Sequence, residues 1–200
     1  SDHEKNVLSG FSGTTGDQMA MELVVESAEV LGADSLIPVE SSHVDGCLYH
    51  GDSGVLYCEK LAENGTQVKI PTTTNVGALN LSKLSQTKLS KEKRDMAYRL
   101  MKVHQEMGCV PTWTCAPYQA GARPSFGQQV AWGESNAVAF TNSILGARTN
   151  RYGDFLDIAC AISARAPYYG LHRSENRTAK LMLDVSNLSN KLLQEDAFFP

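Results

Sequence analysis

The sequence lacks the features of membrane-spanning and nucleic-acid-binding proteins. No stretch approaches the roughly 18 apolar residues that a transmembrane helix needs. The first residues carry Asp2, Glu4 and Lys5 with no long apolar run after them, so we expect no secretory signal. There are 18 Lys and Arg against 22 Asp and Glu, whereas a duplex-binding face needs an excess of basic residues. We therefore expect neither a membrane nor a nucleic acid as a partner.

Closely spaced cysteine pairs and phosphate-binding glycine motifs are also missing. The five cysteines are an odd number in a chain too large to need disulfides, which indicates a reducing compartment, and we expect a cytoplasmic protein. None of the cysteines forms a CxxC pair, so the sequence does not predict a self-contained zinc site. No GxGxxG follows a predicted strand and no GxxxxGK[ST] occurs, so the common nucleotide-binding motifs are absent.

What is present is enough apolar material for a folded core. The 200 residues are 42% hydrophobic and 20% charged, which suits one large domain or two small ones. Apolar residues at helical spacing predict helices at 17–31, 52–62, 91–107, 134–145, 154–164 and 187–195. Short apolar runs predict strands at 35–39, 66–70, 109–114 and 179–185. This alternation predicts a layered α/β fold with a mainly parallel sheet and flanking helices.

Two segments have no periodic pattern, and the chain ends on apolar residues. Residues 114–127 carry prolines and glycines and are predicted to form a loop, and residues 146–153 a polar turn. Residues 197–200 read Ala-Phe-Phe-Pro, which is an unfavourable composition for a solvated end. We expect the 200 residues to be an incomplete part of a larger folded unit.

Polar residues gather in three loops near predicted strands: SSHVDGCLYHGDS at 41–53, PTTTNVG at 71–77 and TCAPY at 114–118. Open α/β sheets bind their ligands at such strand ends. The same residue types also cap helices, form turns or face solvent, and the sequence leaves these interpretations open. These loops are therefore candidate ligand-binding segments.

Cys115 and two arginines are further candidates. Cys115 lies in a predicted loop, whereas Cys58 and Cys160 lie within predicted helices, where thiols pack as small apolar groups. A nucleophilic cysteine needs a positioned base, and no local signature of that chemistry accompanies Cys115. Arg148 and Arg151 flank a turn that suits a carboxylate or phosphate ligand as well as it suits solvent.

Four strings resemble the aconitase X family: SHVDGCLYHGDSG, VKIPTTTN, TCAPYQAG and WGESNAVAFTNSILGARTNRYGDFLDIACAI. The resemblance runs from about Gly10 to the end. Members of this family include cis-3-hydroxy-L-proline dehydratases and the large subunit of archaeal phosphomevalonate dehydratase. The resemblance implies an aconitase-superfamily-like fold, with residues 1–200 as a partial catalytic region. It implies a first α/β domain at about 10–115 and the cluster and substrate loops with following helices at about 114–200.

The resemblance implies an iron-sulfur hydro-lyase, a dehydratase of a small hydroxy acid. The first candidate substrate is cis-3-hydroxy-L-proline, and the second is phosphomevalonate. The family string T-C-[TA]-P-Y implies that Cys115 is a cluster ligand. No part of this chain matches the other two cysteine ligands or the serine base of the superfamily. The remaining part of the enzyme, on the same longer chain or on a partner subunit, would supply them, so we expect this segment to be inactive alone.

With the resemblance, the strand-end loops and the predicted helix start predict the substrate-binding residues His43, Asp52, Thr74, Asn75, Ser135, Asn136, Arg148, Asn150 and Arg151. Two other functions compete with this one. A non-catalytic α/β binding or interaction module is the first alternative, and cysteine-dependent hydrolysis at Cys115 is the second.

Overall fold

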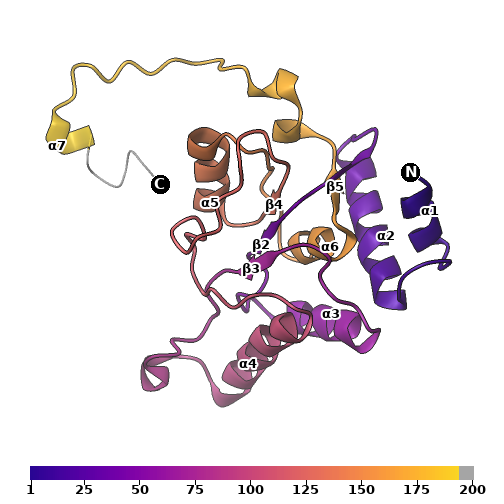
Figure 1. Cartoon of the computed structure of the whole chain (residues 1–200). Helices are drawn as coiled ribbons and strands as arrows, with labels where there is room; N and C mark the ends of the chain where they lie inside the picture. The colour runs from indigo at the N-terminus through magenta and orange to yellow at the C-terminus, as the bar shows by residue number, and fades with distance from the viewer. Residues whose placement is uncertain (194–200) are drawn as a thin grey trace.

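The structure, a computed structural model, describes residues 1–193 and mixes helices with short strands (Figure 1). The α-helices are α1 (Asp2–Leu8), α2 (Thr15–Val30), α3 (Asp52–Glu63), α4 (Lys91–Glu106), α5 (Ser135–Phe140), α6 (Leu156–Ser163) and α7 (Asn190–Leu193). The strands are β1 (Leu36–Pro38), β2 (Ser42–Val44), β3 (Thr72–Thr74), β4 (Ala131–Trp132) and β5 (Arg165–Pro167). Three 3-10 turns (Leu84–Gln86, Gly170–His172, Ser174–Arg177) and one π-helical turn (Thr141–Leu145) complete the described elements.

A parallel sheet lies at the centre of the molecule. Its strand order is β3-β2-β4, and both strand pairs are parallel. Single parallel bridges from Thr73 to Val110 and from Trp132 to Arg151 extend this sheet on both sides. β1 and β5 form a separate antiparallel pair. The carboxyl ends of β2, β3 and β4 therefore lie at one edge of the parallel sheet.

The two faces of the parallel sheet pack against different apolar clusters. Val44 and Ala131 belong to the large core that α2, α3, α4 and α6 build. Trp132, the next residue of β4, belongs instead to a smaller cluster with Tyr118 and residues of α5. Because successive strand side chains point to opposite faces, His43 lies on the same face as Trp132, and the two rings are 5.9 Å apart.

Local sequence signals explain where the long helices begin. Thr14 and Asp17 form a capping box at the start of α2, each side chain accepting a hydrogen bond from the other residue's backbone N–H. Asp17 also accepts a hydrogen bond from Thr66 and pairs with Lys69, so the cap ties α2 to the segment after α3. The Ser90 hydroxyl caps α4.

The predicted helices are found close to their expected bounds. The expected helices at 17–31, 52–62 and 91–107 correspond to α2, α3 and α4, and that at 154–164 to α6. The expected helix at 134–145 consists of α5 followed by the π-helical turn Thr141–Leu145. The last one, at 187–195, corresponds to α7, and its residues 194 and 195 lie outside the described part of the chain. The apolar residues 197–200 also lie outside it.

The α/β class with a parallel sheet is confirmed, but several predicted strand positions are wrong. The strand expected at 35–39 forms as β1, yet it pairs antiparallel with β5. Residues 66–70 form no strand, because the N–H groups of Val68 and Lys69 donate to Met107 and Ala161 instead of to a ladder. Residues 109–114 contribute only the bridge at Val110.

The segment expected as a strand at 179–185 has no strand partner in the described chain. Residues 179–187 are all exposed, including Leu181, Met182 and Leu183, and Figure 1 shows them running away from the body toward α7. An apolar run without a neighbouring strand has no ladder to join. The prediction was wrong because composition alone cannot supply the partner.

Among the described residues, none of the helices combines the length and apolarity that crossing a membrane requires.

Candidate functional site

The register of the parallel sheet gathers polar side chains at its carboxyl edge. In that register His43 of β2 lies opposite both Thr73 of β3 and Trp132 of β4. Side chains alternate along a strand, so an extended chain would direct the residues two positions further on toward the same side as this row. Those residues are Asp45, Asn75 and Glu134, here called the Asn75 cluster.

Hydrogen bonds hold the Asn75 cluster together. Asn75 Nδ2 donates to Asp45 Oδ1 at 2.5 Å and also to Glu134 Oε2. Asn75 itself is buried, whereas Asp45 and Glu134 are half-buried. One amide thus joins two carboxylates that come from different strand ends. Neither carboxylate pairs with a Lys, Arg or His side chain among the described residues.

Cys115 lies next to the Asn75 cluster. Burial and the charges of Glu134 and Asp45 raise the pKa of its thiol, while hydrogen bonding from the Val76 backbone and the Asn75 side chain opposes that rise. Asn136 Nδ2 donates to the Cys115 carbonyl oxygen at 2.9 Å and so ties the loop to α5. Cys115 is the partly exposed member of the five cysteines, and the other four are buried. It is therefore the cysteine best placed to meet a ligand.

His43 lies in the register row that precedes the Asn75 cluster, and it is fully buried. Its Nδ1 is 2.8 Å from the Thr73 hydroxyl, and its Nε2 has no hydrogen-bond partner among the described residues. Burial lowers the pKa of His43 to about 4, although the Asp45 charge and the Thr114 backbone act in the opposite direction. The ring is therefore neutral at pH 7 and reaches no solvent in this structure.

Two other predicted residues, Thr74 and Ser135, lie at this edge. Thr74 is buried, and its hydroxyl donates to the Val110 carbonyl oxygen at 3.3 Å. Ser135 is exposed at the start of α5, where its N–H and hydroxyl contact Glu134 Oε1. The structure thus brings Asn75, Ser135, Asn136 and Cys115 to one place.

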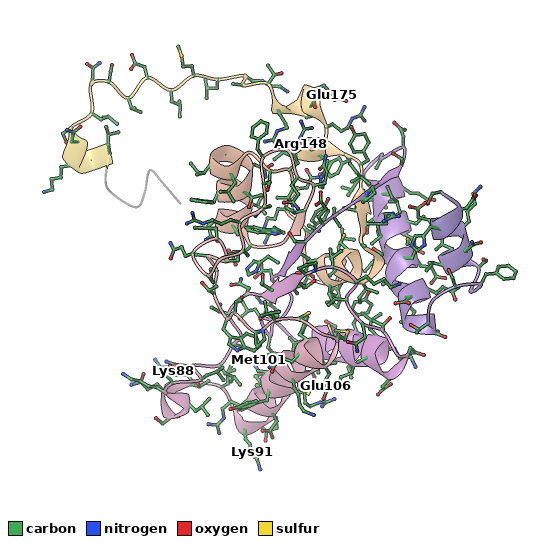
Figure 2. The ribbon with its side chains drawn as sticks, viewed as in Figure 1. Lys88, Lys91, Met101, Glu106, Arg148 and Glu175 are labelled. Atoms are coloured by element: carbon green, nitrogen blue, oxygen red, sulfur yellow. The ribbon has the colours of Figure 1, made fainter. Side chains whose placement is uncertain are left out.

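Arg148 and Asn150 are directed elsewhere. Arg148 bridges to Gln129, before β4 begins, and its guanidinium donates to the His172 carbonyl oxygen and the Ser174 hydroxyl. Figure 2 shows it near Glu175, on the 3-10 turn that contains Ser174. Asn150 is buried, and its amide bonds to the backbone of the 169–171 segment. Both side chains are engaged in packing this segment and not in the Asn75 cluster.

Arg151 and Asp52 remain accessible. The bridge to Trp132 places Arg151 close to the carboxyl edge, and its exposed side chain makes no ion pair with another described residue. Asp52 begins α3 and accepts a hydrogen bond from the Tyr49 hydroxyl at 2.7 Å. Arg151 can therefore meet an anionic group near the edge, whereas no described contact joins Asp52 to the Asn75 cluster.

Asp45 and Glu134 were not among the predicted binding residues. The spacing in the sequence could have indicated them. Asp45 lies two positions after His43 and Glu134 two positions after Trp132, and His43 and Trp132 lie opposite each other in the sheet. The sequence does not mark β2 and β4 as strands because they have only three and two residues. Without these strand assignments, the sequence does not show that His43 and Trp132 are neighbours in a sheet.

The described residues hold one candidate cluster ligand. No group of three or more His, Cys, Asp and Glu side chains within residues 1–193 is arranged to bind a metal ion. An iron-sulfur cluster needs several thiolates, so Cys115 could hold one corner and further ligands would have to come from elsewhere. The position of Cys115, partly exposed beside hydrogen-bond donors, is compatible with that role.

Comparison with known proteins gives consistent matches along the chain. Residues 1–175 match the family described as aconitase X first domain. The cis-3-hydroxy-L-proline dehydratase of Pseudomonas aeruginosa is 37% identical over 197 residues, which are 98% of this chain and 33% of that protein. The phosphomevalonate dehydratase large subunit of Thermococcus kodakarensis is 39% identical over 184 residues, which are 91% of this chain and 45% of that protein.

A solved structure agrees with these matches. The crystal structure of Thermococcus kodakaraensis aconitase X in its holo-form superposes with a TM-score of 0.80 at 38% identity, covering 90% of this chain and 44% of that one. The chain thus spans between a third and a half of the proteins that it matches. The chain belongs to the aconitase X family.

Proposed function

We propose that this chain is part of an iron-sulfur-dependent hydro-lyase that dehydrates a small hydroxy acid. The observation that carries the proposal is the meeting of Cys115 with the Asn75 cluster at the carboxyl edge of the parallel sheet. Relatives along almost the whole chain carry the names of dehydratases. The proposal extends their activity to the larger enzyme that contains this chain.

Cys115 would supply one thiolate to the iron-sulfur cluster, and the other ligands would come from the remaining part of the enzyme. When bound, such a cluster provides a Lewis-acidic iron that can polarise a departing hydroxyl group. Asn136 would keep the Cys115 loop against α5 through the bond to the Cys115 carbonyl oxygen. A serine base for proton removal would also lie outside this segment.

The Asn75 cluster would bind the substrate beside Cys115. The Asn75 amide keeps the Asp45 and Glu134 carboxylates in fixed positions, so their remaining oxygens can accept hydrogen bonds from a ligand. Ser135 adds a hydroxyl at the start of α5, and Arg151 adds a guanidinium that can pair with a substrate carboxylate. His43 would lie beneath this surface, and Thr74, on the other face of the sheet, would hold the Val110 segment.

The charge of the site favours cis-3-hydroxy-L-proline over phosphomevalonate as the substrate. Two carboxylates without a cationic partner among the described residues suit the positively charged ring nitrogen of an imino acid. The phosphate of phosphomevalonate would be repelled by the same carboxylates, so it would need cations that the remaining part of the enzyme supplies. Phosphomevalonate stays the second candidate, because one group of relatives is named for it.

The remaining part of the enzyme is the proposed partner of this chain. The chain covers a third of the hydroxyproline dehydratases, and it covers under half of proteins that are named large subunits. The missing ligands and base could thus lie on a longer chain or on a second subunit.

Replacement of Cys115 in the complete enzyme tests the proposal. We expect Cys115→Ser to lose visible absorbance, bound iron and dehydratase turnover together, because a hydroxyl is a poor ligand for iron-sulfur clusters. The matched control is Cys160→Ser, a buried thiol in α6 that should retain all three and lose only some stability. Cys115→Ser enzyme with normal iron content and turnover would refute the ligand assignment. A parent enzyme without iron would instead favour a non-catalytic module.

A further inference from the structure

We propose that Asp157 is a positioning residue that fixes Asp45 in the site by accepting hydrogen bonds from the two backbone N–H groups that flank the Asp45 Cα. Its effect on turnover rests on the proposed function, but its effect on the loop does not. Asp157 is the second residue of α6 and is fully buried, so it cannot touch a substrate in this structure.

The Asp157 carboxylate accepts hydrogen bonds from three backbone N–H groups. Its Oδ2 accepts from Asp45 N at 2.7 Å and from Gly46 N at 2.9 Å. Its Oδ1 accepts from its neighbour Ile158 N at 2.6 Å. Two successive N–H groups on one oxygen define the path of the chain where it leaves β2. This is the point from which the Asp45 side chain reaches Asn75.

Asp157 makes no ion pair with a Lys, Arg or His side chain among the described residues. Four buried thiols lie close enough to feel its charge: Cys47, Cys58, Cys109 and Cys160. Burial raises the pKa of Asp157 to about 7, against the lowering effect of the three N–H bonds and with a further rise from the Asp154 charge. A buried carboxylate is costly unless its oxygens accept hydrogen bonds, and the three N–H groups supply those bonds here.

Close packing around Asp157 brings three elements together. A Cβ added to Gly46 would lie 3.3 Å from Asp157 Oδ1, and one added to Gly133 would lie 3.2 Å from Asp157 Oδ2 and 3.0 Å from Asp45 Cβ. The ends of β2 and β4 and the start of α6 therefore meet at this carboxylate with little spare room. Phe155, just before α6, has a φ of 74°, a strained value for a bulky residue.

The geometry assigns Asp157 an acceptor role that an uncharged oxygen can replace. Asparagine in the same position can turn its carbonyl oxygen to the Asp45 and Gly46 N–H groups, while its Nδ2 donor replaces the oxygen that accepts from Ile158 N, so that bond is lost and the two donors must move apart. Alanine removes all three acceptors. Asp157→Asn removes the charge and keeps an acceptor oxygen, whereas Asp157→Ala removes both. Comparing the two variants therefore shows whether the acceptor oxygen or the charge is needed.

Hydrogen exchange measured by mass spectrometry on the complete enzyme tests the inference without relying on activity. In Asp157→Ala we expect exchange in the peptide around residues 43–48 to become about 10 to 100 times faster, the scale of losing one or two hydrogen bonds. Peptides from α2 and α4 should keep their rates. Asp157→Asn should stay within about threefold of the parent in the same peptide. Asp154→Ala, the neighbouring half-exposed acid, is the matched control.

Kinetics provide the second readout. Asp157→Ala should lower kcat by about tenfold or more with a smaller change in KM, and Asp157→Asn should restore most of kcat. Should Asp157→Ala fail to fold, Gly46→Ala presses on the same carboxylate from the loop and should give the same local signature.

Three outcomes would overturn the inference: unchanged exchange at residues 43–48 in Asp157→Ala, equally faster exchange throughout the protein, or an Asp157→Asn variant as impaired as Asp157→Ala. If the complete enzyme does not dehydrate any hydroxy acid, the proposed function is refuted, but the inference about Asp157 is not. In that case the exchange data would still decide the role of Asp157.

Discussion

The Asn75 amide donates hydrogen bonds to two carboxylates, so we expect substitution of Asn75 to disturb both. Without its amide, the carboxylates of Asp45 and Glu134 would face each other with no donor between them. We expect Asn75→Ala in the complete enzyme to lower kcat by about tenfold or more, because the two carboxylates lose the donor that holds them in position. Steady-state kinetics with cis-3-hydroxy-L-proline measure this effect.

Asn80→Ala is a suitable control for Asn75→Ala, since Asn80 is an exposed asparagine whose side chain accepts a hydrogen bond from the nearby Lys83 N–H. It should leave kcat unchanged. Equal kinetics for the parent and for Asn75→Ala would mean that the substrate binds away from this cluster.

Single residues show how far the sequence could predict the site. Asn75, Asn136 and Cys115 were all expected in the site, and hydrogen bonds from Asn136 and Asn75 to Cys115 bring the three together. The orientation of an arginine side chain could not be predicted from the sequence in the same way. Arg148 and Arg151 are three apart in one turn, yet Arg148 binds the backbone of a segment more than 20 residues away. No local pattern contains that partner.

At the scale of elements, the long helices could be predicted, whereas of the expected strands only that at 35–39 forms, as β1. α2 and α4 have 16 residues each, enough for several repeats of an apolar face and a capping residue. The strands of the parallel sheet have two or three residues, too few for any alternation to be recognised. The positions of these strands depend on pairing between segments that are distant in the sequence. The periodicity of a single segment carries no information about that pairing.

The packing of α4 against α3 makes stability depend on pH. His104 on α4 is fully buried, donates from Nδ1 to the Leu100 carbonyl oxygen and faces the Cys58 thiol of α3. Burial lowers the pKa of His104 to about 4, with the Leu100 bond opposing it, whereas an unfolded histidine has a pKa near 6.5. The depressed pKa means that its contribution to stability is complete above about pH 6.5 and is lost as the pH falls toward 4.

A His104→Gln variant tests this dependence. Glutamine does not titrate, so the gap in unfolding free energy between the parent and the variant should shrink by about 1.4 kcal/mol per pH unit as the pH falls from about 6 to 5. Urea titrations of the complete enzyme at several pH values measure the gap. The same substitution at exposed His50 controls for the loss of an imidazole. A gap that stays constant from pH 7 to 5 would show that the fold does not exclude the proton from His104.

At the scale of the whole molecule, the chain holds only part of the proposed chemistry. Dehydration needs a Lewis acid at the departing oxygen and a base at the adjacent carbon in the same closed site. The described residues offer one cluster ligand. We expect the purified 200-residue chain to bind no stable cluster and to convert neither cis-3-hydroxy-L-proline nor phosphomevalonate. The exposed apolar residues Leu181, Met182 and Leu183 should promote its aggregation.

A product assay on the isolated chain, beside the complete enzyme at equal concentration, checks this expectation. Mass spectrometry of the isolated chain confirms its length before the assay. Sustained turnover by a monodisperse 200-residue chain would show that both the ligands and the base lie within it. The expected division into a first domain at about 10–115 and following loops and helices at about 114–200 stays a prediction.

The shared register of β2, β3 and β4 has a consequence for insertions and deletions. Asp45, Asn75 and Glu134 each lie two residues past the register row of His43, Thr73 and Trp132, and hydrogen bonds join their side chains. One residue inserted between His43 and Asp45 would turn the carboxylate toward the α6 side, and the same holds in the other two strands. Length changes in aconitase X relatives should therefore be excluded from these three intervals, and they should gather in the loops that lead into the strands.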